Sequence, residues 1–150
     1  MFQRILWPVD GSPLSFNPLH AVINLAKLSG GKIVVLSIAQ PRLFYSTELA
    51  HMQDGNAVEE MNLAAAQDNV QKVCEIGLHV GVDCEGIISM SHIPSDVILD
   101  TVQRANCDVI VMATRGKMGV IETIFKESTT QDVLRSSPVP VLVFPAMNEP

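Results

Sequence analysis

"RILWPVDGSPLSFNPLHAVINLAKLSGGKIVVLSIA", residues 4–39, holds two apolar segments on either side of a helical pattern. The apolar segments, 4–9 and 32–39, are short and nearly continuous rather than alternating, which is typical of parallel strands covered on both faces. Between them, Pro18 suits a first helical turn and Gly30 suits a helix end. The apolar stripe of this predicted helix consists of Leu19, Val22, Ile23, Ala26 and Leu28.

The same alternation continues through the rest of the chain, without internal repeats or a linker. The segment at 82–90 is more polar than the other apolar segments, which indicates a strand at a sheet edge. Strands that alternate with helices imply right-handed crossovers, so the predicted fold class is α/β with a doubly wound parallel sheet. The further predicted strands cover 82–90, 107–113 and 139–144, and the further predicted helices cover 57–78, 94–106 and 128–137.

Local signals add detail to the predicted helices. Ser128-x-x-Gln131 is a capping-box pattern and predicts that Ser128 caps the last helix. In the third helix, Pro94 and Asp96 suit the first turn. Residues 40–56 form an unusually long connection, and such loops are usually functional or mobile. The apolar stripe predicted for the longest helix is Met61, Ala65, Val70, Val73 and Leu78.

Length and composition fit one domain over residues 1–150 that needs neither disulfides nor metal to build a core. Hydrophobic residues make up 47% of the chain, its net charge is −6, its pI is about 5.0 and its mean hydropathy is +0.27. An acidic chain without a basic run is a poor nucleic-acid binder. No apolar stretch has the ~20 residues of a membrane helix, and the N-terminus does not resemble a signal peptide. We therefore expect a cytoplasmic protein without nucleic-acid or membrane partners.

Cysteines and histidines show no metal-binding spacing. Cys74, Cys84 and Cys107 are widely separated, and no CxxC motif is present. We expect three reduced, mostly buried thiols and no tightly bound metal. The four histidines lie in different segments, where surface or packing roles are the simpler interpretation.

Two loops follow predicted strands at the end of the sheet where ligands of open α/β folds bind. One is "PVDGS", residues 8–12, and the other is "ATRGKMG", residues 113–119. If the first and fourth strands are neighbours, both loops face one crevice and Asp10 lies opposite Gly116. Asp10 could equally be only a turn residue, since Asp and Gly favour turns.

Three stretches together resemble the universal stress protein family: "RILWPVDGS", "SHIPSDVIL" and "CDVIVMATRG…STTQDVLRSSPVPVLVF". The resemblance spans nearly the whole chain and keeps the motifs in order. It implies a Rossmann-like fold whose five-stranded parallel sheet has the order 3-2-1-4-5, with helices on both faces. It also implies a homodimer that pairs strand 139–144 with its twin across a two-fold axis. An apolar edge strand would otherwise be an aggregation hazard.

Members of this family that bind ATP or AMP carry G-x2-G-x9-G-(S/T) after the fourth strand. Here these positions fall on Ala113, Gly116, Glu127 and Ser128, and the gap is one residue too long. Gly119-x9-Thr129 also fits part of the spacing, but leaves the fourth strand out of register. The phosphate loop is therefore degenerate.

The resemblance implies an adenine-nucleotide site, with Mg²⁺ only if ATP is bound. Asp10 and the backbone at Pro8 and Val9 would meet adenine and ribose, and the backbone at Ile38 would read adenine. The last helix would offer its N-terminus to phosphate. The remaining implied residues are Met112, Ala113 and Gly116 for ribose and phosphate, and Ser128, Thr129 and Thr130 at that helix start.

Other interpretations stay open. Universal stress protein A-type members act without nucleotide, so a dimer that works through contact with an unknown protein partner is the alternative. Ser128 could simply cap its helix, and Glu127 could be a solvated residue. "SGG" at 29–31 is similar to the start of an ATP pyrophosphatase loop, but it ends a helix instead of following a strand. We expect no dedicated enzyme and at most slow ATP hydrolysis.

Overall fold

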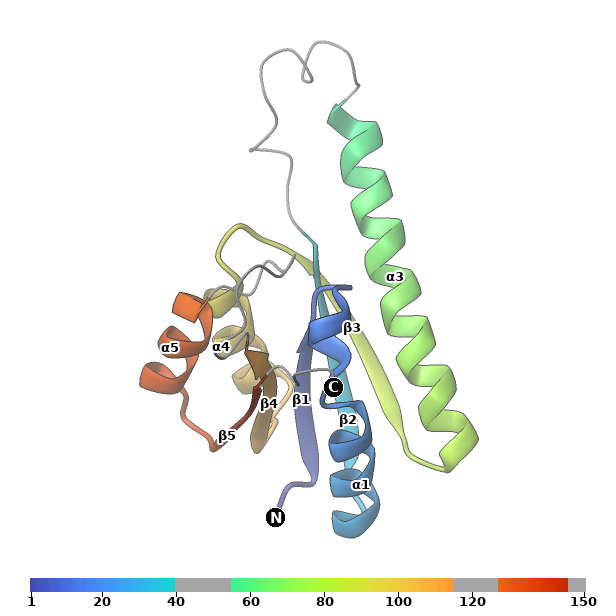
Figure 1. Cartoon of the computed structure of the whole chain (residues 1–150), viewed down its shortest axis with the longest axis vertical. Coiled ribbons are helices and arrows are strands. Elements are labelled where there is room, and N and C mark those ends of the chain that lie inside the picture. Colours follow the sequence, from blue (N-terminus) through green and yellow to red (C-terminus); the bar gives the residue numbers. More distant parts are fainter. Residues whose placement is uncertain (40–54, 115–126, 146–150) are drawn as a thin grey trace, which may run out of the picture.

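The computed structural model describes residues 1–39, 55–114 and 127–145. Strands and helices alternate along the chain as predicted, with one short 3-10 helix, η1, after the first strand (Figure 1). The strands are β1 (Arg4–Val9), β2 (Lys32–Ala39), β3 (Cys84–Met90), β4 (Val109–Thr114) and β5 (Val141–Pro145). The helices are η1 (Pro13–Phe16), α1 (Leu19–Ser29), α3 (Gly55–Val80), α4 (Pro94–Arg104) and α5 (Glu127–Ser136).

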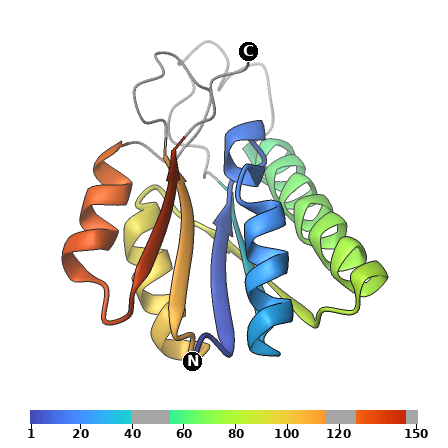
Figure 2. The ribbon, with the colours of Figure 1, turned by 60° about the horizontal axis from the view of Figure 1, so that its bottom comes forward.

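The five strands form one parallel sheet in the order β3-β2-β1-β4-β5. This order confirms the one implied by the family resemblance. β1 and β4 are neighbours, as the crevice between their loops requires, and the more polar strand β3 lies at an edge. Helices α1 and α3 cover one face of the sheet, and α4 and α5 cover the other (Figure 2).

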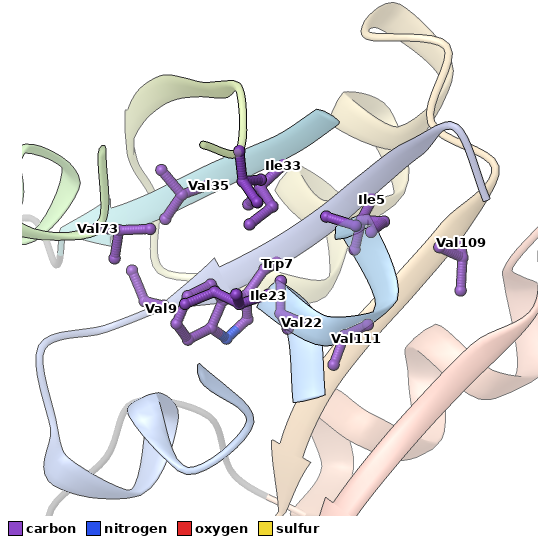
Figure 3. Close-up of a cluster of buried hydrophobic side chains, with 12 residues drawn as sticks. Ile5, Trp7, Val9, Val22, Ile23, Ile33, Val35, Val73, Val109 and Val111 are labelled. Carbon is purple, nitrogen blue, oxygen red and sulfur yellow. The ribbon is translucent and has the colours of Figure 1, made fainter. Parts of the chain in front are cut away.

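Two hydrophobic cores lie on the two faces of the sheet. On the first, Trp7 and Val9 of β1 pack among side chains from α1, α3 and the neighbouring strands (Figure 3). On the second, Leu6 packs with Ile98 of α4 and Val133 of α5. Alternate residues of β1 therefore serve opposite cores, which explains why the central strands are apolar throughout rather than alternating.

The stripes predicted for two helices are wrong in part. Leu28 is exposed although α1 buries Val22, Ile23 and Ala26. In α3, Met61, Ala65 and Leu78 are exposed. This helix packs against β2 and β3 at one side of the sheet. It therefore covers only a narrow strip, in which Ala66, Val73 and Gly77 are buried and Val70 is partly buried.

Helix ends follow the sequence signals at two places and depart from them at a third. Gly30 adopts a φ of 65° and donates its N–H to Ala26, so it ends α1 as predicted. Pro94 and Asp96 lie in the first turn of α4, as predicted. The capping-box prediction is wrong, because α5 begins at Glu127 and Ser128 is already inside its first turn.

Candidate functional site

The candidate site lies where β1, β2 and β4 end. β1 pairs with β2 up to Val9 and Ser37. Its ladder with β4 ends earlier, at Leu6 and Ile110, although both strands continue, to Val9 and Thr114. β1 and β4 therefore part before their carboxyl ends. This parting is the topological switch point of an open α/β sheet, where ligands bind.

The turn after β1 is organised by Asp10. Its Oδ1 accepts hydrogen bonds from the Ser12 backbone N–H at 2.8 Å and from Ser12 Oγ at 2.5 Å. Gly11 between them has a φ of +85°, a left-handed conformation that favours glycine. An added Cβ at Gly11 would lie 2.8 Å from Asn69 Nδ2 of α3. Asp10 therefore has the turn role that one of the two interpretations gave it.

The same turn is anchored to the sheet through η1. Ser12 caps η1 by accepting from the Ser15 N–H at 3.3 Å, and the Ser15 hydroxyl accepts from the Asp10 N–H at 3.3 Å. Trp7 of β1 donates its Nε1–H to the Ser15 carbonyl at 3.1 Å. The Trp7 ring also meets Phe16 edge-on, with centroids 6.0 Å apart. Because η1 packs against β4, the loop after β1 is fixed beside the end of β4.

Half of the ten predicted contact residues are buried in the sheet. Pro8, Val9, Ile38, Met112 and Ala113 are all buried. The side chains of Ile38 and Met112 belong to the core beneath α4 and α5. Any contact of these five residues with a ligand would therefore be made by their backbone, as was expected for Pro8, Val9 and Ile38.

The predicted phosphate end of the site is described only in part. Ser128 is exposed, whereas Thr129 and Thr130 are buried in the first turns of α5. Within the described residues, the buried Thr130 Oγ1 has no hydrogen-bond partner. Helices of a parallel α/β fold run opposite to the strands, so the N-terminus of α5 lies at the carboxyl end of the sheet (Figure 2). Gly116 lies outside the described residues, as do residues 40–54 of the long connection.

Sequence reasoning missed several polar groups of this region. Ser12 and Ser15 hold the Asp10 turn, and their Ser-x-x-Ser spacing before a helical pattern could have indicated a cap. Ser37 on β2 carries a buried hydroxyl that no described group bonds, and a lone serine in an apolar strand gave no signal. In the part of the chain that is described, no three His, Cys, Asp or Glu residues gather as metal ligands.

A separate groove lies between β3 and α4. Its volume is about 410 Å³, and Asp96, Val97 and Asp100 of α4 line it together with Ile87 and Ser89 of β3. None of the nine predicted contact residues that the structure describes lines it. Ser89 pairs with Ile38 in the sheet, so the groove adjoins the predicted adenine side without forming part of it.

The universal stress protein family model matches residues 1–145. The chain belongs to the universal stress protein family. One relative, universal stress protein Sll1654 of Synechocystis, is 30% identical over 97% of this chain and 87% of its own length. Among the described residues of this universal stress protein, no helix is both long and apolar enough to cross a membrane.

Solved structures share the fold. MJ0577, a hypothetical protein in a study that assigned its biochemical function from its structure, superposes with a TM-score of 0.80 at 24% identity. That match covers 99% of both chains. A universal stress protein from Arabidopsis thaliana, solved with AMP bound, superposes with a TM-score of 0.69 at 18% identity. It covers 97% of this chain and 92% of the plant chain.

Proposed function

We propose that this universal stress protein binds an adenine nucleotide, AMP in preference to ATP, in a stress-response or regulatory role. The proposal rests on the separation of β1 and β4 before their carboxyl ends, with the Asp10 turn fixed beside β4. Backbone N–H and C=O groups at the ends of these strands have left the β1–β4 ladder, so they are available to a ligand. The AMP held by the Arabidopsis relative on the same fold supports this choice of ligand.

The preference for AMP rests on the degenerate phosphate loop. Helix α5 still begins close to Ser128 and directs its N-terminus to the carboxyl end of the sheet, which suits one phosphate. Glu127, its first residue, stands where nucleotide-binding members keep a glycine. A carboxylate there repels additional phosphate charges more than a single α-phosphate next to β4.

Two variants, one at Asp10 and one at Ser12, test the proposed nucleotide site. Asp10→Ala should weaken AMP binding by roughly 1–3 kcal/mol if a charged hydrogen bond is lost. Ser12→Ala removes the hydroxyl that donates to Asp10 and caps η1, but it keeps the carboxylate and the hydrogen bond from the residue-12 N–H, so it reports the effect of the turn geometry. Calorimetry with AMP and ATP on folded variants gives the result. If AMP does not bind to wild type at millimolar concentration, or if Asp10→Ala binds it unchanged, the proposed site is wrong.

A second proposal concerns self-association. β5 is the free edge on the β4 side of the sheet, and Leu142 on it is 40% exposed, while Leu134 of α5 is 52% exposed. We propose that strand 139–144 pairs with its twin in a homodimer, which covers this apolar edge. Light scattering at micromolar concentration should give about twice the chain mass. A dimer that binds no adenine nucleotide would favour the alternative function through protein contact.

A further inference from the structure

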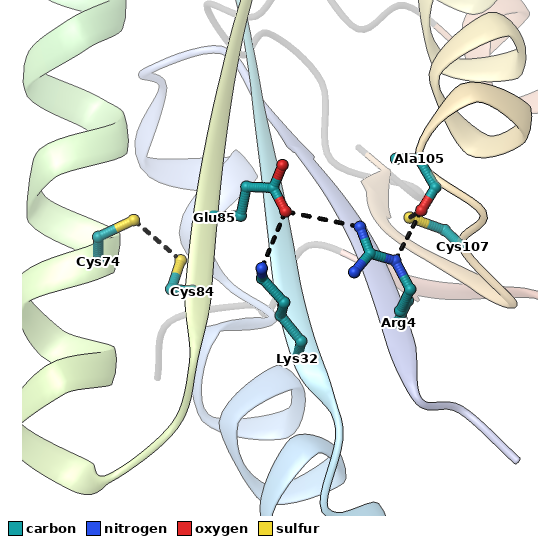
Figure 4. Close-up of polar contacts among 7 residues, drawn as sticks. All are labelled: Arg4, Lys32, Cys74, Cys84, Glu85, Ala105 and Cys107. Carbon is teal, nitrogen blue, oxygen red and sulfur yellow. Dashed lines mark hydrogen bonds and ion pairs between the residues drawn. The ribbon is translucent and has the colours of Figure 1, made fainter.

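Two cysteines that are ten residues apart in the sequence face each other across the contact between α3 and β3. The side chain of Cys74 on α3 points toward the sheet, and that of Cys84, the first residue of β3, points toward the helix (Figure 4). Their Sγ atoms lie 3.0 Å apart and share a hydrogen bond. A disulfide bond is about 2.0 Å long. The two sulfurs therefore need to approach each other by only about 1 Å to bond.

Glycines hold the helix close to the strand on both sides of this pair. A Cβ added at Gly77, one turn along α3, would lie 3.4 Å from Cys84 Cβ and 2.9 Å from the Val82 carbonyl oxygen. A Cβ added at Gly86 on β3 would lie 1.9 Å from Cγ1 of Val70, one turn back along α3. The backbones are thus packed at a distance that larger residues would not allow, and the sulfurs are kept together by the surrounding contacts.

We propose that Cys74 and Cys84 form a reversible intramolecular disulfide when the protein meets a peroxide. Cys74 Sγ, as thiolate, attacks one peroxide oxygen, and the O–O bond breaks to give a sulfenic acid and, after protonation, water. Cys84 Sγ then attacks Cys74 Sγ, and the sulfenic oxygen leaves as a second water. Two thiols and one hydrogen peroxide thus give one disulfide and two waters. A dithiol reductant reverses the change.

The local chemistry affects the rate of these steps. Burial, then the hydrogen bond with Cys74, raises the pKa of the Cys84 thiol, which lowers the share of Cys84 present as thiolate at neutral pH. Both cysteines are only partly buried, at the contact between α3 and the edge strand β3, so each residue keeps some exposure to solvent. Cys107 is buried in the core on the other face, and burial raises the pKa of its thiol to about 11. It serves as an internal control.

Mass spectrometry tests the proposal on the full, reduced chain. Hydrogen peroxide in excess should remove two hydrogen atoms from the protein mass and leave one of its three thiols open to alkylation after denaturation. Glu75 and Glu85 separate the three cysteines, so cleavage after glutamate places each on its own fragment. Without reductant, the Cys74 and Cys84 fragments should stay joined. Oxidised glutathione, a small disulfide, should give the same product by exchange.

Single variants identify the bond. Cys107→Ser should keep the joined fragments, and Cys74→Ser should lose them. If Cys74→Ser does not fold, the fragment map of the wild-type protein still shows which two cysteines are joined. The proposal is overturned if wild type keeps three alkylatable thiols in excess peroxide. It is equally overturned if peroxide yields sulfinic acid on separate fragments, if Cys107 joins the linked pair, or if glutathione remains attached at Cys74. None of these outcomes depends on nucleotide, so the result stands apart from the proposed AMP site.

Discussion

Replacing Gly86 by Ala should destabilise the protein by forcing α3 away from β3. The new Cβ would lie 1.9 Å from Val70 Cγ1 and 3.2 Å from Val70 Cβ. Carbon atoms pack at about 3.5–4.0 Å, so the groups must separate by about 1.6 Å or more. Val70 has little freedom at χ1 within a helix, so the helix backbone has to move. Overpacking of this kind costs roughly 1–3 kcal/mol.

Part of that cost is offset by the gain from removing a strand glycine, about 0.5–1 kcal/mol. A net loss of up to about 2.5 kcal/mol remains, which lowers the melting temperature by up to roughly 10 °C for a domain of this size. Urea titration and calorimetry measure it. The same substitution should slow formation of the Cys74–Cys84 disulfide, because it separates the two elements that carry the sulfurs.

A double-mutant cycle identifies the contact. In a Val70→Ala background the clashing Cγ1 is gone, so Gly86→Ala should become neutral or stabilising, with a coupling of about 1–2 kcal/mol. Gly81→Ala is the control, because Gly81 has a φ of +77° and no atom within 4 Å of an added Cβ. Its cost is backbone strain, which Val70→Ala cannot relieve. Equal destabilisation by Gly86→Ala in both backgrounds would refute the packing argument.

Three further predictions concern charge and redox state. Glu85 bonds Lys32 at 3.0 Å, and the hydrogen bond and charge of Lys32, then Arg4, lower the pKa of its carboxyl (Figure 4). Because a lowered carboxyl pKa stabilises the fold above the unfolded pKa, Glu85→Gln should cost at most about 1 kcal/mol at neutral pH. Urea titrations should show that cost shrink as the pH falls below the ordinary value of 4.5 and vanish once the pH is below the lowered pKa of the folded state. The Cys74–Cys84 disulfide should stabilise the chain by about 2–3 kcal/mol against its reduced form, unless native strain opposes it, and calorimetry of both forms checks this. Glu127→Gly should improve ATP binding more than AMP binding, with a gain that shrinks at high salt, and equal effects on both nucleotides would mean that the carboxylate does not face the phosphates.

The strands could be predicted from the sequence because a strand that is buried on both faces has a nearly continuous apolar sequence. β1, β2 and β4 are nearly continuously apolar, since alternate residues such as Leu6 and Trp7 serve opposite cores. The exposed apolar residues of α3 could not be predicted, because Met61 and Leu78 fit helical spacing as well as the buried strip does. Only the width of the strip that β2 and β3 leave for the helix decides which residues are covered.

Contacts between side chains on different helices and strands could not be predicted, because no local sequence pattern indicates them. The Cys74–Cys84 pair joins a helix to the strand that follows it, with a turn at Gly81 between, so a search for CxxC spacing passes over it. The salt bridges of Glu85 with Arg4 and Lys32 join three adjacent strands in the same way. The salt-bridge partners meet because of the strand order β3-β2-β1, and that order came from the family resemblance rather than from periodicity.

Asp10 shows why the turn and ligand roles of one residue need not compete. Its Oδ1 accepts from Ser12 and thereby fixes the loop beside β4, while Ser15 and Trp7 tie the same loop to the sheet. A nucleotide that meets backbone groups at Pro8, Val9 and Ala113 requires those groups to be held in place before it arrives, because ordering them on binding would subtract from its affinity. Under the proposed function, we therefore expect the carboxylate to contribute to binding through loop geometry even without a contact to ribose. On this reasoning Ser12→Ala should weaken AMP binding in the same direction as Asp10→Ala but less, because it removes the Ser12 hydroxyl and keeps the Asp10 carboxylate with its hydrogen bond from the residue-12 N–H.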